Sequence, residues 1–361
     1  MAITDTEEKK DFLIGYTLAG SLMCKCPHPE CNKCSDGKYY IISPDVFRKR
    51  QKENLEPCTK LLPVKRVETK NTRPERFVKS ILDDVGIEYK TKVQDVIPKG
   101  ELDIYIPEKK LAIECNGICD ENEDKKCHLE KTTECQLKGI TLIQIWEDQI
   151  VNKPDIVKSM IINRLGLTKN RIYARKCEIK DVSPKMANVF LEQNHIQGGS
   201  MASVRLGLFY NNELVSLMTF GKKRGCMGNT KIQTEGEWEL VRFCSKLNTQ
   251  IPGAAGKLFD YFKKQYKPKI IYSFASRDIS HGHVYEKLGF KSDGKVTSSY
   301  WYIEPFSMRR YHRSAFTKSA IIRRGWCTTK DGWTEGSIMK ARGYIKLVDA
   351  GQTKWIYECK H

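Results

Sequence analysis

The sequence predicts a mixed α/β protein that is divided into several domains. The chain has 361 residues, which exceeds the usual size of one domain. Hydrophobic residues make up 40% of it, enough to fill a core in each domain. Apolar segments of strand length alternate with amphipathic segments of helix length, which is typical of an α/β fold. We expect four segments, which are residues 1–70, 71–167, 171–305 and 306–361.

The charge of the chain predicts the class of its partner. The formal net charge is +18, from 62 Lys and Arg against 44 Asp and Glu. Such an excess favours a polyanion, because each basic side chain set against a phosphate releases condensed counterions. We therefore expect a polyanionic partner such as double-stranded DNA. A basic protein without such a partner would have the same composition, so the charge predicts no chemistry.

Cysteine content and hydropathy predict the compartment. The chain begins MAITDTEEKKDF, in which no basic region precedes an apolar stretch, and no run of about 18 apolar residues follows. We therefore expect neither a signal peptide nor a membrane span. The fourteen cysteines then point to a reducing compartment, where cysteines bind metal or are buried. This predicts a cytoplasmic protein.

Residues 71–167 predict the order helix, strand, strand, helix, strand, helix. Thr72 can cap the first helix, Pro74 suits its first turn, and Gly86 ends it. The strands ELDIYIP and KLAIEC are joined by a Pro-Glu-Lys-Lys turn. A helix over residues 128–138, the buried strand ITLIQIW and an amphipathic helix over residues 155–165 complete the segment.

The expected hairpin brings two carboxylates to the same end. Asp103 lies early in its first strand and Glu114 late in its second, so antiparallel pairing makes them neighbours. Oxygen ligands of this kind hold Mg²⁺ against a phosphodiester. The spacing is that of the PD-(D/E)xK nuclease core, with Asn116 where that core has lysine. Two ordinary acidic residues near strand ends have the same spacing, which is therefore a weak signal by itself.

The surrounding motifs are more specific. The segments RPERFVKSIL, IECNG and KKCHLEKTTECQLKGITLIQIWEDQ closely resemble the EDxHD homing endonucleases of phages, relatives of the very-short-patch repair endonuclease. The resemblance covers Thr72 to Asp148 and implies a PD-(D/E)xK-like fold. The tryptophan-histidine pair that this family often carries after CNG is replaced by CDENEDKK. Carried over position by position, the implied catalytic residues are Glu75, Asp103, Glu114, His128 and Asp148.

The resemblance also implies roles for these residues. Asp103 and Glu114 would ligate Mg²⁺ or Mn²⁺, and His128 would act as general base or hold the attacking water. Glu75 and Asp148 would orient the histidine or complete an outer metal shell. Glu147 is the alternative to Asp148 in the sequence WEDQ. A single histidine at a helix start is more often structural, but His128 lies within the family's motif.

Four cysteines form a compact cluster near the amino terminus. The cluster CKCPHPECNKC contains Cys24, Cys26, Cys31 and Cys34. Four thiolates are a suitable set for structural Zn²⁺, and the last two have knuckle spacing. Cys58 can replace one ligand, and a cysteine-rich loop without metal is the alternative. We do not expect zinc at the second set, which is Cys115, Cys119, Cys127 and Cys135.

Residues 171–305 predict a second α/β unit, with a hairpin across Asn211 and Asn212 and a helix from Gly253 to Tyr266. Its pattern resembles the GNAT acyltransferase fold, particularly the Mom-like DNA-modifying branch. Gln250, Gly253 and Ala255 fit the (Q/R)xxGx(G/A) loop, which receives a cofactor pyrophosphate at a helix N-terminus. YEKLGF at residues 285–290 supports the resemblance. Gln250, Gly253 and Ala255 would bind a cofactor only if this domain is active, and we do not expect acetyl-coenzyme A to be bound. Three polar residues could line such a site or form an ordinary loop, and these are Asp278, Ser280 and His281.

The carboxy-terminal tail is expected to be basic, irregular and in contact with DNA. Aromatic residues are interleaved with its basic residues, so the former could stack on bases while the latter follow phosphates. A solvated charged surface is the alternative. The expected DNA-binding residues are Arg309, Arg310, Arg313, Arg323 and Arg324.

These features lead to one hypothesis and two rivals. The leading hypothesis is a Mg²⁺-dependent homing endonuclease that cleaves DNA at a specific site, in the host cytoplasm if a phage encodes it. The first rival is a Mom-like DNA-base acyltransferase with a vestigial nuclease domain. The second is a DNA-binding protein without catalysis.

Overall fold

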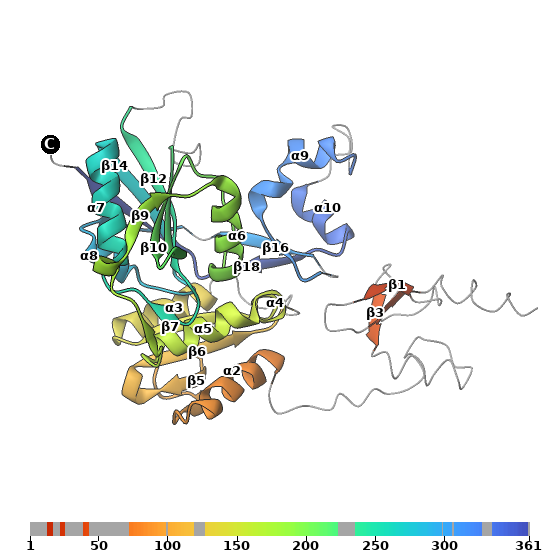
Figure 1. Cartoon of the computed structure of the whole chain (residues 1–361). Helices are drawn as coiled ribbons and strands as arrows, with labels where there is room; N and C mark the ends of the chain where they lie inside the picture. Colours follow the sequence, from red (N-terminus) through yellow and green to blue (C-terminus); the bar gives the residue numbers. More distant parts are fainter. Residues whose placement is uncertain are drawn as a thin grey trace, which may run out of the picture. The chain divides into compact units, whose positions relative to one another are not determined.

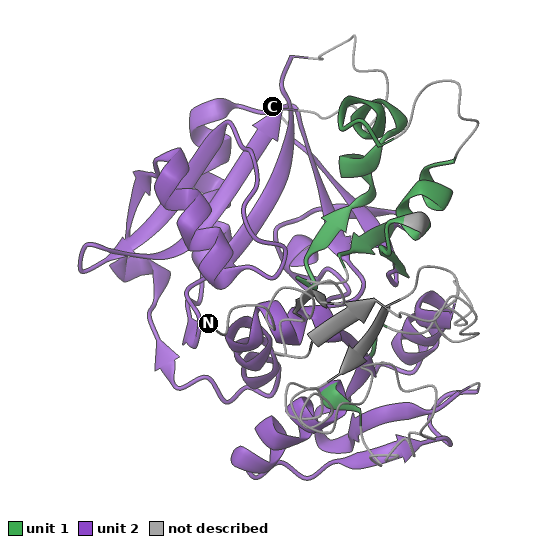
Figure 2. Cartoon of the chain, turned by 90° about the vertical axis from the view of Figure 1, so that its right-hand side faces the viewer, with its two compact units in different colours: residues 1–73, 117–120, 300–347 green, residues 74–116, 121–299, 348–361 purple. Residues whose placement is uncertain are grey.

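The computed structural model has a mixed α/β fold, as predicted, and two compact units (Figure 2). The smaller unit comprises residues 1–73, 117–120 and 300–347, and the larger comprises residues 74–116, 121–299 and 348–361. The described residues are 13–16, 22–25, 39–42, 72–98, 100–118, 127–222, 235–297, 299–304, 307–326 and 334–359. Among these residues, no helix combines the length and the apolar character that crossing a bilayer requires.

The first half of the larger unit, residues 74–116 and 121–167, is built on a four-stranded sheet (Figure 1) and is called the four-stranded half below. The sheet order is β4-β5-β6-β7, with antiparallel pairs except for the parallel pair β6 and β7. Its strands are β4 (Lys90–Val93), β5 (Leu102–Ile106), β6 (Leu111–Asn116) and β7 (Thr141–Trp146). Its helices are α2 (Arg73–Asp84), the 3-10 turn η2 (Pro107–Lys109), α3 (Cys127–Leu137), α4 (Glu147–Asn152) and α5 (Pro154–Arg164).

Helices cover both faces of this sheet because its strands are apolar on both. Helices α2 and α5 pack on one face, where Leu82 and Val157 meet Ile113 in one core. Helix α3 covers the other face, where Cys135 packs against Leu142. Strand β6 is buried along its whole length, and β7 is buried over all but its first residue, as predicted for ITLIQIW. Polar residues on β6 are therefore held inside the protein.

The second half of the larger unit carries a seven-stranded sheet and is called the seven-stranded half, residues 170–299 and 348–359. The order is β15-β19-β14-β12-β11-β10-β9, and β12 with β14 is the parallel pair. Its strands are β9 (Glu178–Asp181), β10 (Val204–Tyr210), β11 (Glu213–Lys222), β12 (Glu237–Ser245), β14 (Ile270–Ser276), β15 (Lys291–Thr297) and β19 (Gln352–Glu358). The remaining elements are β8 (Asn170–Arg171), η3 (Ala174–Lys176), α6 (Pro184–Asn194), β13 (Thr249–Gln250), α7 (Ala254–Tyr266) and α8 (His283–Lys287).

Two local features of this half follow from its sequence. Asn211 and Asn212 both have positive φ, 49° and 63°, which matches the type I′ turn that joins β10 and β11. Strands β12 and β14 pair over Glu237–Glu239 with Ile270–Tyr272, although both strands run further. The cavity described below lies beside the unpaired part of these strands.

The carboxy-terminal region differs from the irregular tail that the sequence suggested. Strand β19 lies between β14 and β15, inside the seven-stranded sheet, and pairs antiparallel with both. Residues 300–347 are consequently an insertion in the β15–β19 hairpin. Ser299 and Asp349, at the two ends of this insertion, are hydrogen-bonded: Ser299 N donates to Asp349 Oδ1 (3.2 Å) and Asp349 N to Ser299 O (3.3 Å).

The insertion has its own core and sheet, in the order β17-β16-β18. Its elements are β16 (Tyr300–Ile303), β17 (Arg310–His312), η5 (Arg313–Phe316), α9 (Lys318–Arg323), α10 (Glu335–Ala341) and β18 (Ile345–Val348). The core is built from Tyr302, Phe316, Ile321, Ile338 and Met339. Aromatic residues of the expected DNA-contacting tail therefore stabilise this small fold, with Phe316 in the core and Tyr311, Trp326 and Tyr344 packed against it.

The amino-terminal segment is described as a three-stranded antiparallel sheet of β1 (Leu13–Tyr16), β2 (Leu22–Lys25) and β3 (Tyr39–Ile42). Cys24 lies on β2. Three of the cysteines proposed for zinc lie outside the described residues, and these are Cys26, Cys31 and Cys34.

Deleting residues 300–347 and joining Ser299 to Val348 through two glycines is expected to leave the larger unit folded. The ends of the insertion already meet, so a short turn can replace it. Circular dichroism should show a cooperative thermal transition within about 5 °C of that of the full chain, or roughly 1–2 kcal/mol. Aggregation or a broad transition would show that the seven-stranded sheet needs the insertion.

Candidate active site

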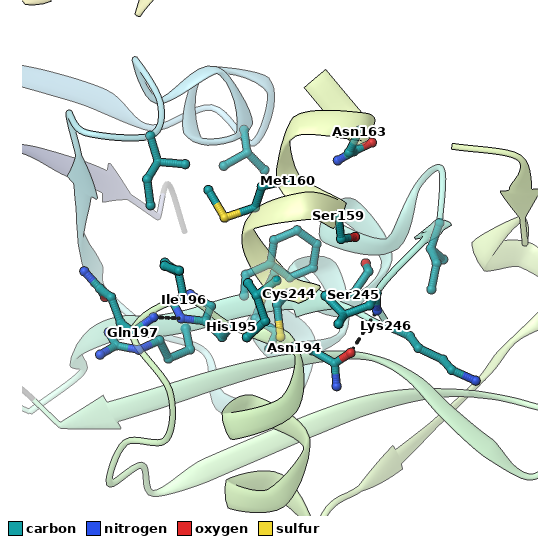
Figure 3. Close-up of a pocket in the computed structure, with 18 of the residues that line it drawn as sticks. Ser159, Met160, Asn163, Asn194, His195, Ile196, Gln197, Cys244, Ser245 and Lys246 are labelled. Atoms are coloured by element: carbon teal, nitrogen blue, oxygen red, sulfur yellow. Dashed lines mark hydrogen bonds between the residues drawn. The ribbon is translucent and has the colours of Figure 1, made fainter. Parts of the chain in front are cut away.

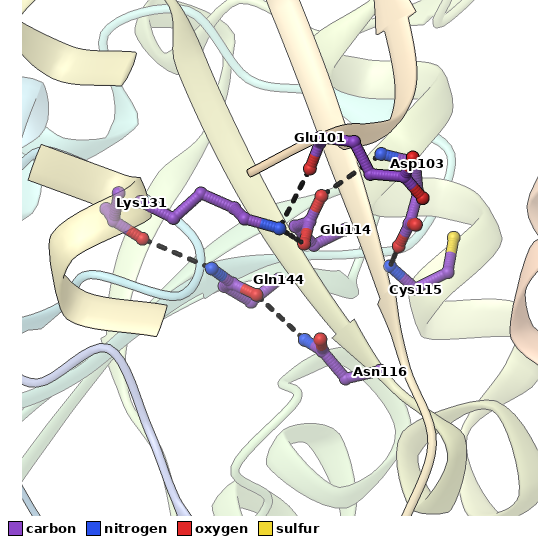
Figure 4. A network of polar contacts seen from close by, with 8 residues as sticks. Glu101, Asp103, Glu114, Cys115, Asn116, Lys131 and Gln144 are labelled. Carbon is purple, nitrogen blue, oxygen red and sulfur yellow. Dashed lines mark hydrogen bonds and ion pairs between the residues drawn. The ribbon is translucent and has the colours of Figure 1, made fainter. Parts of the chain in front are cut away.

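The centre of the candidate site is a carboxylate pair across β5 and β6 (Figure 4). Asp103 and Glu114 lie one step beyond the paired residues Ile104 and Ile113, on adjacent strands. Asp103 N donates to Glu114 Oε1 (3.1 Å), and Cys115 N donates to Asp103 Oδ2 (2.8 Å). Each side chain is thus held by the main chain of the opposite strand. The hairpin brings these two residues together as the spacing predicted.

Lys131 of α3 completes the centre of the site and was missed by the sequence analysis. Its Nζ forms an ion pair with Glu114 and also donates to Glu101 O (2.9 Å) (Figure 4). A signal was present in the sequence. Asn116 stands where the PD-(D/E)xK spacing has lysine, and Lys131 lies three residues after His128, on the same face of α3.

The electrostatics of the pair reflect two carboxylates held close together in a partly buried place. Burial, followed by the charge of Glu114, raises the pKa of Asp103 to about 7, although the Cys115 N–H and Lys131 act against this. The charge of Glu75 also raises the pKa of Asp103. Burial lowers the pKa of Lys131, but the ion pair with Glu114 outweighs it, so this pKa is raised overall. Near neutral pH Asp103 is therefore partly protonated, and the pair carries less than two negative charges.

Asn116 has a different environment from that of a catalytic lysine. Its Nδ2 donates to Gln144 Oε1 (2.7 Å), and Gln144 Nε2 donates to Thr132 Oγ1 (3.2 Å). All three side chains are buried. This amide chain ties β6 to β7 and α3, so Asn116 stabilises the sheet on which the carboxylates lie.

The other expected catalytic residues lie on three helices of the four-stranded half. Glu75 on α2 is buried and pairs with Lys79 at 3.5 Å. His128 on α3 is buried, with its ring edge-to-face against Trp146 at a centroid distance of 4.8 Å. Asp148 on α4 is buried as well, whereas its alternative Glu147 is half-buried.

The structure therefore brings part of the expected set together. The charges of Glu114 and Glu75 both act on Asp103, and Lys131 forms an ion pair with Glu114. Within the described ranges, no three His, Cys, Asp or Glu side chains are grouped closely enough to hold a metal ion. The carboxylate pair with Lys131 is the arrangement on which a hydrolytic site would have to be built.

The loop expected to bind a cofactor lies at the start of α7. Gly253 has φ of 84°, a conformation that favours glycine, and directly precedes the helix, with Ala255 in its first turn. Gln250 Nε2 donates to Asn163 Oδ1 of α5 (3.1 Å). The side chain of Gln250 is therefore already engaged by the four-stranded half.

A cavity of about 740 Å³ lies between β12, β14 and α5 (Figure 3). Its lining includes Gln250, His195, Met160 and Tyr285. Burial lowers the pKa of His195 to about 3, so this imidazole is neutral. The described lining residues do not include Asp278, Ser280 or His281, which the sequence had suggested as candidates.

The arginines expected to bind DNA lie on the insertion, mostly against aromatic rings. Arg309 lies over Tyr311 at 5.2 Å, Arg310 over Trp301 at 5.7 Å, and Arg313 over Tyr300 at 5.4 Å. Arg324 lies over Phe316 at 4.8 Å, and Arg323 is exposed on α9. Cation–π contacts of this kind restrain long side chains while leaving their donors available.

Comparisons with known proteins found similar solved structures. No family model matches the chain, and no curated protein matches it. The catalytic domain of the homing endonuclease I-Bth0305I is 35% identical over 27% of this chain and 96% of its own length, with a TM-score of 0.23. A Bacillus subtilis acetyltransferase in complex with CoA is 13% identical over 51% of this chain and all of its own, with a TM-score of 0.28. An Elizabethkingia anophelis GNAT acetyltransferase with bound acetyl-CoA is 12% identical over 51% of this chain and 99% of its own, with a TM-score of 0.27.

Replacing Asp103 with Asn is expected to stabilise the protein at high pH and not at low pH. Because the folded-state pKa of Asp103 is raised to about 7, the folded protein holds a proton that the unfolded chain releases above about pH 4. Stability contributed by this group is therefore lost as pH rises from about 4 to 7. In EDTA, the variant should exceed the wild type by about 2 kcal/mol at pH 8 and match it at pH 4. A difference that is the same at both pH values would contradict the raised pKa.

Proposed function

We propose that the chain is a metal-dependent DNA endonuclease whose active site is centred on Asp103, Glu114 and Lys131. The observation that carries the proposal is the carboxylate pair itself, with the pKa of Asp103 raised to about 7. Burying two like charges together costs stability, and such arrangements concentrate at functional sites. The resemblance of residues 72–148 to EDxHD homing endonucleases supports the same centre.

The residues fit a hard divalent cation such as Mg²⁺ or Mn²⁺. Asp103 and Glu114 would hold it with carboxylate oxygens from adjacent strands, and its positive charge would oppose the burial and the charge of Glu114 that raise the pKa of Asp103. When bound, the ion would polarise the scissile phosphate and lower the pKa of a water molecule.

The chain's own residues would perform the remaining steps. Lys131, three residues from His128 on α3, would stabilise negative charge on the phosphate, in place of the lysine absent at Asn116. His128 would hold the attacking water or accept its proton, while Glu75 and Asp148 would orient the groups around it.

Double-stranded DNA is the proposed substrate, cleaved at a specific site as in a phage homing endonuclease. The net charge of +18 supplies the attraction to phosphates. Arg309, Arg310 and Arg313 on the insertion, held over aromatic rings, are the proposed phosphate contacts. A zinc knuckle at the amino-terminal cysteines remains a further proposal.

The second candidate function is transfer of an acyl group to a DNA base. The cavity beside Gln250 and Tyr285 favours it, because this cavity adjoins the loop in the cofactor-binding pattern. The hydrogen bond from Gln250 to Asn163 weighs against it, because that side chain already has a partner in α5. Binding of acetyl-coenzyme A measured by calorimetry, together with a modified base in treated DNA, would favour this candidate over the endonuclease.

Asp103→Ala and Lys131→Met are each expected to abolish cleavage and to leave DNA binding nearly unchanged. The first removes a metal ligand and the second removes a positive charge at the phosphate, each of which contributes several kcal/mol to catalysis. Plasmid cleavage with Mg²⁺ should fall by roughly 1,000-fold or more, while binding in Ca²⁺ stays within about threefold. Lys138→Met, which lies just after α3, is the matched control. Cleavage at the wild-type rate in either active-site variant would refute the proposed centre.

The triple variant Arg309→Ala, Arg310→Ala and Arg313→Ala is expected to bind DNA more weakly and with a smaller salt dependence. For each phosphate that the variant no longer neutralises, the slope of log affinity against log salt should decrease by about 0.9. The control is Lys176→Ala, Lys185→Ala and Lys264→Ala, which removes the same charge from exposed positions of the larger unit. Equal slopes for both variants would show that overall charge, and not the insertion, is responsible.

A further inference from the structure

A segment of the seven-stranded half is hydrogen-bonded to the four-stranded half. This segment is residues 277–279, which directly follow β14. Gln144 N in β7 donates to Asp278 O (2.7 Å), and Arg277 Nη2 donates to Thr133 Oγ1 in α3 (3.0 Å). Arg164 Nη2 in α5 donates to Ile279 O (2.7 Å). Three consecutive residues thus contact three elements of the four-stranded half, which are β7, α3 and α5.

The carboxylate of Asp278 is fixed within this contact. The side chain is buried, with 4% of its surface exposed. Its Oδ1 accepts from Ala350 N (2.8 Å), and its Oδ2 accepts from Trp146 Nε1 (3.1 Å). A buried carboxylate is costly unless its oxygens are hydrogen-bonded, and hydrogen bonds to charged groups are strong and directional. Asp278 therefore holds the indole of Trp146 at its single N–H.

The indole held by Asp278 packs against the candidate catalytic histidine. The rings of Trp146 and His128 lie edge-to-face, with centroids 4.8 Å apart and planes at 67°. Both side chains are buried, so neither ring can turn without displacing its neighbours. The orientation of His128 consequently depends on that of Trp146, and the orientation of Trp146 depends on Asp278.

We propose that Asp278 is a positioning residue that acts through Trp146 to orient His128. This inference rests on the proposed function, in which His128 holds the attacking water or accepts its proton. It makes the nuclease-like site depend on a carboxylate of the seven-stranded half. The seven-stranded half then contributes to the endonuclease activity, whether or not its own cavity binds a ligand.

The test compares Asp278→Asn with Asp349→Asn in the full-length protein. Asp349 is an equally buried carboxylate, 3% exposed, whose Oδ1 accepts from Ser299 N and from Gly351 N (3.0 Å), both within the seven-stranded half. Trp146→Phe is the second variant, because it keeps an aromatic ring and removes the indole N–H from which Asp278 accepts a hydrogen bond.

The first readout is the NMR spectrum of the histidine rings, which needs no catalytic activity. The ring current of Trp146 shifts the His128 ring protons, and the signal is assigned by its loss in His128→Gln. We expect Asp278→Asn and Trp146→Phe to move this signal and Asp349→Asn to leave it in place. A His128 signal that is unmoved in Asp278→Asn overturns the proposal.

The second readout is cleavage of DNA under saturating substrate. Asp278→Asn and Trp146→Phe should each lower kcat by roughly 10- to 100-fold, with KM unchanged, because residues that orient a catalytic group have effects of this size. In the Trp146→Phe background, Asp278→Asn should have little further effect on kcat. Multiplicative losses in the double variant, or an equal loss in Asp349→Asn, would mean that Asp278 only stabilises the fold. If the histidine signal moves as expected and wild-type protein cleaves no DNA, the positioning stands and the endonuclease proposal fails.

Discussion

The candidate site depends on the close approach of Asp103 and Glu114 across an antiparallel pair of strands. Hydrogen bonds from the main chain of the opposite strand hold both side chains, so neither can move away from the other without breaking a bond of the hairpin. Lys131 offsets part of the repulsion, and the remainder contributes to the raised pKa of Asp103. Holding two carboxylates together lowers the stability of the fold, and a positive charge beside them offsets this loss.

The larger unit joins two different α/β architectures into one body. Its joining contacts are specific hydrogen bonds, including those from Trp146 to Asp278 and from Gln250 to Asn163. A buried polar contact such as that of Trp146 with Asp278 favours one relative orientation of two surfaces, whereas apolar packing alone tolerates several. The first contact fixes the indole that packs against His128, and the second engages Gln250 of the expected cofactor-binding loop. The four-stranded and seven-stranded halves are therefore hydrogen-bonded to each other beside both places.

The insertion shows how a folded element can be added to a sheet without disturbing it. Strands β15 and β19 are adjacent and antiparallel, and the hydrogen bonds between Ser299 and Asp349 close the end of their hairpin. Residues 300–347 leave and return at that point and bury their own apolar residues. The aromatic rings of this small fold stabilise it from inside and hold arginines from outside. Apolar and basic residues are interleaved in the sequence of the insertion. In the structure the apolar residues form its core, and the arginines lie over aromatic rings.

The sequence by itself determined the elements whose signals are local. The Asp103–Glu114 hairpin, the buried strand β7 and the Asn-Asn turn were predictable, because turn residues, strand periodicity and helix ends depend on neighbours in the chain. Only the tertiary structure decided the contacts between distant segments. The ion pair of Lys131 with Glu114, the place of β19 inside the sheet and the bond from Trp146 to Asp278 each join residues far apart in sequence. The physical reason is that a side chain's partner across a sheet or between two halves is set by packing geometry, to which local propensity contributes nothing.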